Sequence, residues 1–242
     1  MKEVFRLRPA NKRTVEELQE PYLWFSRPSE YNDINDANVF AFIQDNENIK
    51  QSFIRLFGEY AKIFEQSELT GICSFTKTLP VINLWRKFPN GKNAIFIKYD
   101  KNFIEKHFQD TFGLGDCFKE IEYLDNPTLF KKYSNHDILW KKTENVELYK
   151  SVREIEKDTK LRDELFLKMF TRLNKKFSFQ NELRIILGGS NIPDKAKIIK
   201  GYKVPIPKKA ILSVYLQPQT PSETIKEIEN LDIKIHKQLK NN

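Results

Sequence analysis

The chain has 242 residues, of which 40% are hydrophobic and 13% aromatic, so it can bury a sizeable core and is not a disordered chain. Its formal net charge of +8 favours a polyanion, such as nucleic acid or a nucleotide, as a partner. The lysines are scattered along the sequence, however, and a solvated surface in a compositionally biased genome would look the same. The charge alone therefore leaves both interpretations open, a polyanion partner and an ordinary solvated surface.

Cysteine and histidine usage argues against several kinds of site. Cys73 and Cys117 each stand alone among apolar neighbours, so neither a disulfide framework nor a cysteine-based zinc site is expected. The three histidines are far apart and lack metal-ligand spacing, so no metal is predicted. The N-terminus lacks the apolar region of a signal peptide, and no run of 18 apolar residues occurs. We therefore expect a cytoplasmic protein without a membrane partner.

The chain opens with a predicted strand at residues 4–8, which places Arg6 and Arg8 on the same side. Two guanidinium groups on one strand face suit a diphosphate, because each can present paired donors to phosphate oxygens. The alternative is simply a basic strand edge. A short helix at 11–20, capped by Asn11 or Thr14, and a second strand at 22–26 follow.

The middle of the chain combines helical and strand patterns. Residues 37–64 predict an amphipathic helical segment, and residues 71–76 and 94–99 predict strands on either side of an aromatic segment that contains Trp85. A helix is predicted to begin within 103–108, and a strand is expected at 118–124. Residues 127–175 are predicted to form a helical insertion. The charged residues at 153–160 of this insertion are mixed in sign, as on a solvated helix face.

The segment FSFQNELRIIL, residues 177–187, carries the most informative pattern. It predicts a strand with Asn181, Leu183, Ile185 and Leu187 on one face, and Gln180, Glu182, Arg184 and Ile186 on the other. An amide, a carboxylate and a guanidinium in a row could share a ligand in a cleft. They could equally form an ion pair on a solvated strand, worth about 1 kcal/mol or less.

The C-terminal part predicts strands at 202–206 and 210–216 and a helix at 221–230. Pro205 and Pro207 place the first of these strands at a sheet edge, because proline cannot donate a ladder hydrogen bond. No repeat or linker interrupts the chain. We therefore predict one α+β domain over residues 1–242, with a mixed, mostly antiparallel central sheet flanked by helices.

Several motifs resemble, in order, a widespread bacterial family known as a domain of unknown function. They are YLWFSRPSEYND, ICSFT with LWRKF and AIFIKYD, FQNELRIIL, and AILSVYLQPQTPSETIKEIE. The resemblance spans nearly the whole chain. The chain departs from the family pattern at Gln180, Leu183 and Ile34, where the family often has an acid, tryptophan and proline. These departures leave Glu182 and Arg184 in place, but they put in doubt any role that needs two acids on this strand.

More distantly, the order of elements resembles the ADP-ribosyltransferase fold, particularly its DarT-like branch. The resemblance implies NAD as a substrate and no metal. It maps Arg6 with Arg8 to the first strand's cationic position, Ser26 to the hydroxyl position of the second strand, and Glu182 to the catalytic carboxylate.

These roles are chemically coherent. Cleavage of the nicotinamide glycosidic bond passes through an oxocarbenium-like state, which a carboxylate such as Glu182 stabilises. Arg6 and Arg8 would then hold the diphosphate and Ser26 the ribose, with Arg184 beside the ligand. Trp85 or Tyr99 could stack on a ring, although core packing is the ordinary role of such aromatics.

Two functions follow as expectations. The first is an NAD-dependent ADP-ribosyltransferase-like enzyme, a toxin or phage-defence effector that modifies DNA, RNA or protein and has an antitoxin or defence-system partner. The alternative is a non-catalytic domain that binds nucleic acid or a nucleotide through Arg6, Arg8, Arg27 and Arg184.

Overall fold

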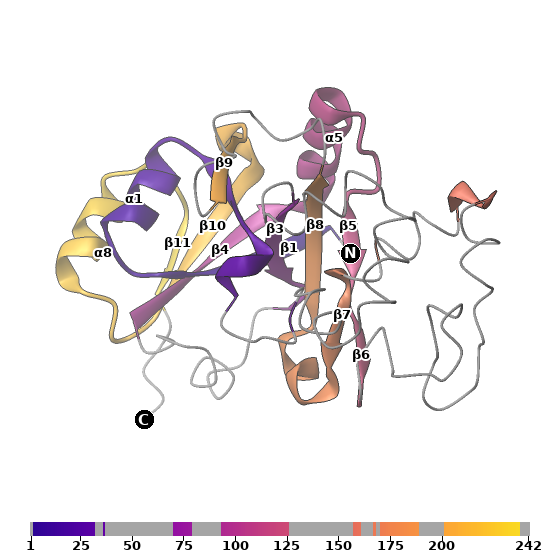
Figure 1. The fold of residues 1–242 in the computed structure, drawn as a ribbon. Coiled ribbons are helices and arrows are strands. Elements are labelled where there is room, and N and C mark those ends of the chain that lie inside the picture. Colours follow the sequence, from indigo (N-terminus) through magenta and orange to yellow (C-terminus); the bar gives the residue numbers. More distant parts are fainter. Residues whose placement is uncertain are drawn as a thin grey trace.

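A computed structural model describes residues 2–31, 36, 70–78, 93–125, 157–160, 167, 170–188 and 201–237. Within these residues the fold is α+β, with a mixed, mostly antiparallel sheet and a few helices, as predicted (Figure 1). The main sheet contains β1 (Glu3–Pro9), β2 (Tyr22–Ser26), β3 (Thr70–Thr76), β4 (Ala94–Asp100), β5 (Phe118–Glu120), β8 (Glu182–Gly188), β9 (Gly201–Pro205), β10 (Ile211–Leu216) and β11 (Ile235–Lys237).

The sheet branches at β3. Its main path runs β11-β10-β4-β1-β3-β2-β9, and β8 pairs with β3 along its whole length while β5 pairs with β8. The pairing of β3 with β1 is short and places Phe5 opposite Thr76, and its pairing with β2 places Ser26 opposite Ile72. β9 ends the path, which confirms the edge position expected from its prolines.

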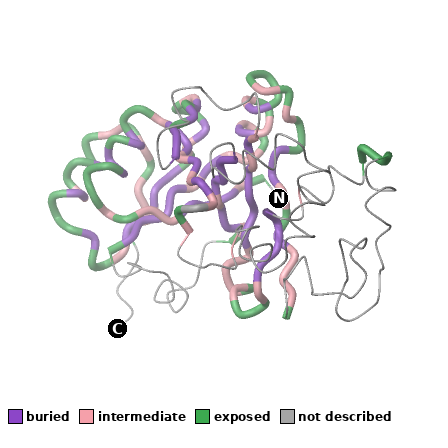
Figure 2. Tube along the Cα trace, in the orientation of Figure 1, coloured by how far each residue is buried: buried purple, intermediate pink, exposed green. Residues whose placement is uncertain are grey.

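The two sides of the sheet differ in what covers them. Apolar side chains of α1 (Lys12–Gln19), α5 (Lys101–Phe112) and α8 (Ser222–Glu229) join one core with strand residues such as Val4, Ile97 and Ile185. Figure 2 shows the buried residues concentrated in the strands, with exposed residues along the helices. We call this the helix-covered face. The candidate site described below lies on the opposite face.

Local signals explain where two of the helices start. The Asn11 side chain accepts a hydrogen bond from the Thr14 amide at 3.2 Å, which caps α1 as predicted. The Asp100 side chain caps α5 in the same way, through the Phe103 amide at 3.0 Å. α5 ends at Phe112, and Gly113 follows it with a φ of 69°, the left-handed conformation that glycine adopts easily.

The strand predicted at 118–124 is interrupted. β5 ends at Glu120, and β6 (Glu122–Leu124) belongs to a separate two-stranded parallel sheet with β7 (Arg172–Asn174). The break falls at Ile121, which is buried. The strand predicted over the whole of 118–124 was therefore wrong, because its two halves pair with different partners.

The strand predicted at 177–187 begins later than expected. Residues Lys175–Gln180 form a 3-10 helix, η4, and β8 starts at Glu182. Asn181 lies between them with a φ of 44°, a left-handed conformation that asparagine tolerates better than most residues. The predicted faces nevertheless hold within β8, where Leu183, Ile185 and Leu187 join the core beneath the helices.

Short 3-10 helices complete the described elements: η1 (Pro28–Glu30) follows β2, and η7 (Lys208–Ala210) precedes β10. The strands β1, β2, β3, β4, β9 and β10 and the terminal helix α8 lie within a few residues of their predicted positions. The end of the predicted helical insertion was wrong, because Arg172–Asn174 form the strand β7, which pairs with β6. The short strand β11 was not predicted. The predicted helical segment at 37–64 and Trp85 lie outside the described residues, as does most of the predicted insertion at 127–175.

Candidate functional site

A pocket of about 320 Å³ lies on the face of the sheet opposite the helices. Its floor crosses β8, β3, β1 and β4, because the register places Glu182 opposite Thr76, Thr76 opposite Phe5, and Leu7 opposite Phe96. Residues directly opposite one another on paired strands point to the same side of a sheet. The strand pairing itself therefore assembles this pocket from segments far apart in the sequence.

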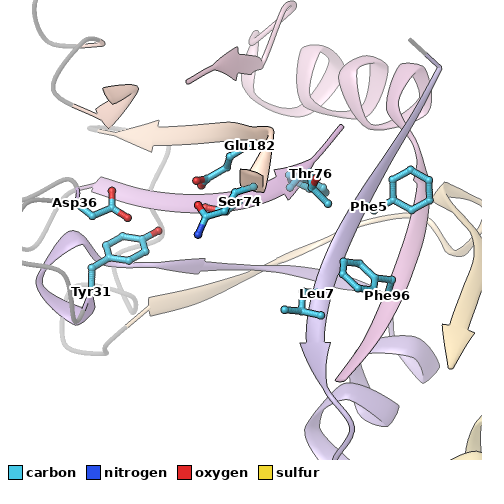
Figure 3. A pocket seen from close by; sticks show the side chains of 10 residues that line it. Phe5, Leu7, Tyr31, Asp36, Ser74, Thr76, Phe96 and Glu182 are labelled. Atoms are coloured by element: carbon cyan, nitrogen blue, oxygen red, sulfur yellow. The ribbon is translucent and has the colours of Figure 1, made fainter. Parts of the chain in front are cut away.

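The pocket has a polar end and an apolar end. Tyr31, Asp36, Ser74 and Glu182 gather at one end, while Phe5, Leu7 and Phe96 lie at the other (Figure 3). Thr76 lies between the two groups in this view. Gln180 and Phe75 complete the described lining. A cavity of this size, with a few convergent polar groups and an apolar wall, is the usual form of a small-molecule site.

Glu182 is fixed at the polar end by Arg184. Arg184 Nε donates to Glu182 Oε1 at 2.8 Å, and Nη2 donates to Oε2 at 3.4 Å. Arg184 Nη1 donates to the Phe170 carbonyl oxygen at 2.8 Å. Nη2 also donates to Asp36 Oδ2 at 3.0 Å and lies 2.8 Å from Oδ1. One guanidinium thus links two carboxylates and one carbonyl from three separate segments.

The ion pair between Glu182 and Arg184 is buried. Arg184 is 1% exposed and Glu182 is 7% exposed, so the solvated pair that the sequence allowed is wrong. Burial by itself lowers the pKa of Arg184, but the charges of Glu182 and Asp36 outweigh it and raise the pKa. Arg184 therefore stays charged, and it holds the two carboxylates in place.

Two tyrosines support this arrangement. The Glu182 amide donates to the Tyr123 hydroxyl at 2.8 Å, and burial is the main reason that the pKa of Tyr123 rises to about 12. Burial likewise raises the pKa of Tyr31, whose hydroxyl is hydrogen-bonded to Ser74. The Arg184 guanidinium carbon lies 5.9 Å from the centre of the Tyr31 ring. Both hydroxyls are protonated at neutral pH and can donate hydrogen bonds.

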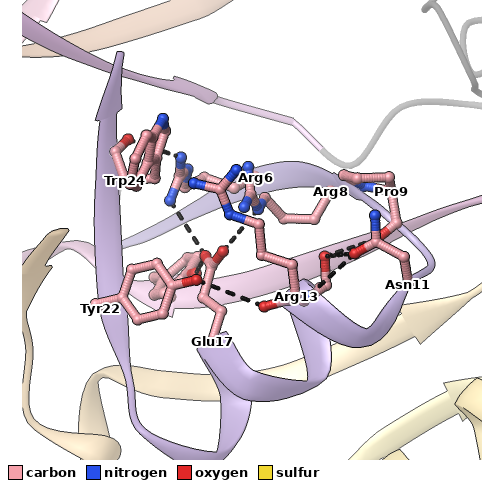
Figure 4. A network of polar contacts seen from close by, with 10 residues as sticks. Arg6, Arg8, Pro9, Asn11, Arg13, Glu17, Tyr22 and Trp24 are labelled. Carbon is pink, nitrogen blue, oxygen red and sulfur yellow. Dashed lines mark hydrogen bonds and ion pairs between the residues drawn. The ribbon is translucent and has the colours of Figure 1, made fainter. Parts of the chain in front are cut away.

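Arg6, Arg8 and Tyr99 lie on the helix-covered face of the sheet, gathered around Glu17 of α1 (Figure 4 shows Glu17 with both arginines). Arg6 Nη1 lies 3.2 Å from Glu17 Oε1, Arg8 Nε lies 2.7 Å from Oε2, and the Tyr99 hydroxyl donates to Oε1 at 3.3 Å. Arg6 Nη2 also donates to the Trp24 carbonyl oxygen at 3.2 Å. We call Arg6, Arg8, Glu17 and Tyr99 the Glu17 cluster.

The structure therefore separates the residues that the sequence grouped. Glu182 lines the pocket and Arg184 contacts it there without lining the pocket itself. Arg6, Arg8 and Tyr99 instead contact Glu17 beneath α1 and do not line the pocket. Ser26 is paired with Ile72 of β3, which puts it on the same side of the sheet as Ser74, but it does not line the pocket either. Tyr99 is fully buried and belongs to the core.

Several pocket residues were not selected from the sequence. Ser74 and Thr76 alternate on β3, and such a polar alternation inside an apolar strand is a sequence signal that points to them. Asp36 carries no such signal in the sequence. It belongs to the site because it contacts Arg184, which lies 148 positions further along the chain. Phe5 and Leu7 carry only an ordinary core pattern, and contact with the pocket depends on the pairing of β1 with β3 and β4.

Within the described part of the chain, no three histidine, cysteine, aspartate or glutamate side chains gather as metal ligands. The helices of that part include none long and apolar enough to cross a bilayer. Comparison of the chain with protein-family models, curated proteins and solved structures finds no match.

Proposed function

We propose that the protein is an NAD-dependent enzyme with an ADP-ribosyltransferase-like fold, and that the pocket on the sheet face opposite the described helices is its reaction centre with Glu182 as catalytic carboxylate. The observation that carries this proposal is the position of Glu182. It lies at the polar end of a pocket of about 320 Å³ whose other end is aromatic. A ribose and the ring attached to it need this combination of hydroxyl-binding groups and apolar wall.

Glu182 is prepared for such a role by its surroundings. Arg184 occupies one position on each carboxylate oxygen, and a carboxylate offers about four acceptor positions in total. The remaining positions can accept ribose hydroxyls. The fixed negative charge would then stabilise the positive charge that develops on the ribose as the glycosidic bond breaks.

The hydroxyl groups at the polar end extend this site. Ser74, Thr76 and Tyr31 line the pocket beside Glu182, and each can exchange hydrogen bonds with a sugar. The proposal does not include Arg6 and Arg8 as diphosphate ligands, because both are paired with Glu17 away from the pocket. The acceptor is nucleic acid or protein, and the net charge of +8 favours nucleic acid.

The test compares the native protein with Glu182→Gln, which keeps the shape of the side chain and removes its charge. Each protein is incubated with labelled NAD and a mixture of DNA, RNA and cell extract, and nicotinamide release and label transfer are followed. We expect a loss of about 10²-fold or more in rate for Glu182→Gln, as for other residues that stabilise transition-state charge.

Two controls accompany this experiment. Glu227→Gln removes an exposed carboxylate on α8 and should retain the native rate. Thermal unfolding of every variant separates a loss of chemistry from a loss of folding. A folded Glu182→Gln variant with native turnover, or a native protein that never consumes NAD, would refute the proposal.

The alternative, a non-catalytic domain that binds a polyanion, gains no support from its four arginines. Arg6, Arg27 and Arg184 are buried, and Arg8 is 13% exposed and paired with Glu17. Nucleic acid would have to bind through other cationic side chains, such as lysines or the exposed Arg13. Such binding would weaken steeply with added salt, so salt-sensitive binding without NAD turnover would favour this alternative.

A further inference from the structure

Two exposed cations lie on aromatic rings where β2 pairs with β9. The guanidinium carbon of Arg13, on α1, lies 4.0 Å from the centre of the Trp24 ring (Figure 4). Lys203 Nζ lies 4.4 Å from the centre of the Tyr22 ring. Trp24 and Lys203 are directly opposite each other on the paired strands, so both point to the same side of the sheet. We call Arg13, Tyr22, Trp24 and Lys203 the β9-edge cluster.

The rings of this cluster are held in place by their own contacts. Tyr22 is buried, and its hydroxyl donates to the Arg13 carbonyl oxygen at 3.5 Å. The Trp24 indole lies against the backbone of Gly201, where a β-carbon would come within 2.7 Å of the ring. Arg13 and Lys203 are exposed, and Trp24 is half-buried. The cluster therefore presents two cations at the surface in defined positions, which lowers the entropy cost of binding an anion.

The rings hold these two cations without neutralising them. Lys77 and Lys98 each form an ion pair with a carboxylate. Arg13 and Lys203, by contrast, form no ion pair with any described residue, and this includes Glu16, the exposed acid one turn beyond Arg13 on α1. A cation on an aromatic ring keeps its full charge. Both side chains thus remain available to an anionic partner.

The Glu17 cluster adds positive charge behind Arg13. Arg6 and Arg8 are both paired with the single carboxylate of Glu17. Burial and the charge of Arg6 are the main reasons that the pKa of Arg8 is lowered, and the charge of Arg13 lowers it further. Three guanidinium groups therefore lie near one carboxylate, and the excess positive charge reaches the surface at Arg13.

We propose that the β9-edge cluster binds the backbone of single-stranded nucleic acid, with Arg13 and Lys203 on its phosphate groups. Charged hydrogen bonds from a guanidinium or ammonium group to phosphate are among the stronger ones in proteins. The half-buried indole and the guanidinium that lies on it offer a surface on which bases stack. That this nucleic acid is the acceptor of ADP-ribose rests on the proposed function, whereas the binding itself does not.

The test measures fluorescence anisotropy of a labelled single strand of about ten thymidines, a length that one binding surface can cover. The full chain is titrated at several salt concentrations. Arg13→Gln and Lys203→Gln should each weaken binding about fivefold and reduce the slope of log affinity against log salt by about 0.7, because each removes one phosphate contact. Lys2→Gln removes the same charge from an exposed residue at the far end of β1 and should change neither quantity appreciably.

Variants of Trp24 test the aromatic part of the surface, because they leave both cations in place. Trp24→Leu should weaken binding about tenfold, since it removes the ring on which Arg13 lies and on which a base stacks. Trp24→Phe keeps a ring and should retain most of the affinity. Thermal unfolding identifies any variant that is not folded, and only folded variants are compared.

Three results would overturn the inference. The first is native affinity in a folded variant that carries both Arg13→Gln and Lys203→Gln. The second is an equal loss of affinity in Lys2→Gln, which would show a general effect of net charge. The third is equally strong competition by a polyglutamate peptide of the same charge, which would replace nucleic acid by an acidic protein as the partner.

The outcome also separates this inference from the proposed function. Strand binding that depends on Arg13 and Lys203, in a protein that never consumes NAD, would keep the binding surface and discard the enzyme. NAD turnover with label transfer to nucleic acid that is unaffected by Arg13→Gln and Lys203→Gln would keep the enzyme and discard this surface.

Discussion

Arg6 and Arg184 are buried arginines on opposite faces of one sheet, and each depends on particular partners. Arg6 contacts Glu17 and the Trp24 carbonyl oxygen, while Arg184 contacts Glu182, Asp36 and the Phe170 carbonyl oxygen. Removing one partner of a buried ion pair leaves a charge that water cannot reach. These residues therefore stabilise the fold mainly by satisfying one another.

Replacement of Glu17 by glutamine tests this at the residue scale. Glu17 is fully buried and faces both Arg6 and Arg8, so Glu17→Gln should lower the free energy of unfolding by about 3–5 kcal/mol. Glu16→Gln, its exposed neighbour on α1, should change it by less than about 0.5 kcal/mol. Urea denaturation measures both, and equal effects would contradict the assignment of the Glu17 cluster.

At the scale of elements, the junction between η4 and β8 decides where Glu182 lies. Asn181 turns the chain from the 3-10 helix into the strand with a positive φ of 44°. Its carbonyl oxygen accepts a hydrogen bond from the Lys77 amide at 2.9 Å, which ties the junction to the end of β3. The strand starts at Glu182 because this turn comes directly before it.

Substitution of Asn181 measures the cost of that turn. Asn181→Ala should destabilise the protein by about 1 kcal/mol or more, because a β-carbon disfavours the left-handed conformation in residues without asparagine's local hydrogen bonding. Asn181→Gly should be close to the native stability, since glycine adopts this conformation without strain. Thermal unfolding compares the pair. An alanine variant as stable as the glycine variant would show that the positive φ carries no cost.

The whole molecule buries ionisable groups in its core, and this makes its stability depend on alkaline pH. Cys73 is fully buried, and burial raises the pKa of its thiol from the ordinary 9.0 to about 11. Above pH 9 the unfolded chain releases this proton while the folded chain keeps it. The contribution of Cys73 is therefore complete below pH 9 and is lost as the pH rises towards 11.

Urea denaturation between pH 8.5 and 10 tests this prediction against Cys73→Ala, because the tyrosines also titrate near pH 10 but are the same in both proteins and cancel in the difference. The native protein should lose free energy of unfolding more steeply with pH than Cys73→Ala, by up to about 1 kcal/mol per pH unit. The alanine variant starts from a lower stability because of its cavity, so the slope and not the level is compared. Identical slopes would refute the pKa assignment.

The sequence by itself determined most of the described helices and strands and the two faces of β8. The reason is that alternation, proline placement and helix capping act over a few neighbouring residues. Asn11 therefore predicted the start of α1, and Pro205 and Pro207 predicted that β9 lies at an edge. It also selected Glu182, which lines the pocket, and Arg184, which binds the Glu182 carboxylate from behind the lining.

Only the tertiary structure decided what those side chains face. The sequence left open whether Glu182 and Arg184 lie on a solvated strand, and it placed Arg6 and Arg8 with them. The surroundings of these side chains depend on contacts between segments that are distant in the sequence. Arg184 donates a hydrogen bond to Asp36, 148 positions away, and Tyr99 donates one to Glu17, 82 positions away. Such contacts follow from strand pairing and packing across the whole sheet, which no local pattern encodes.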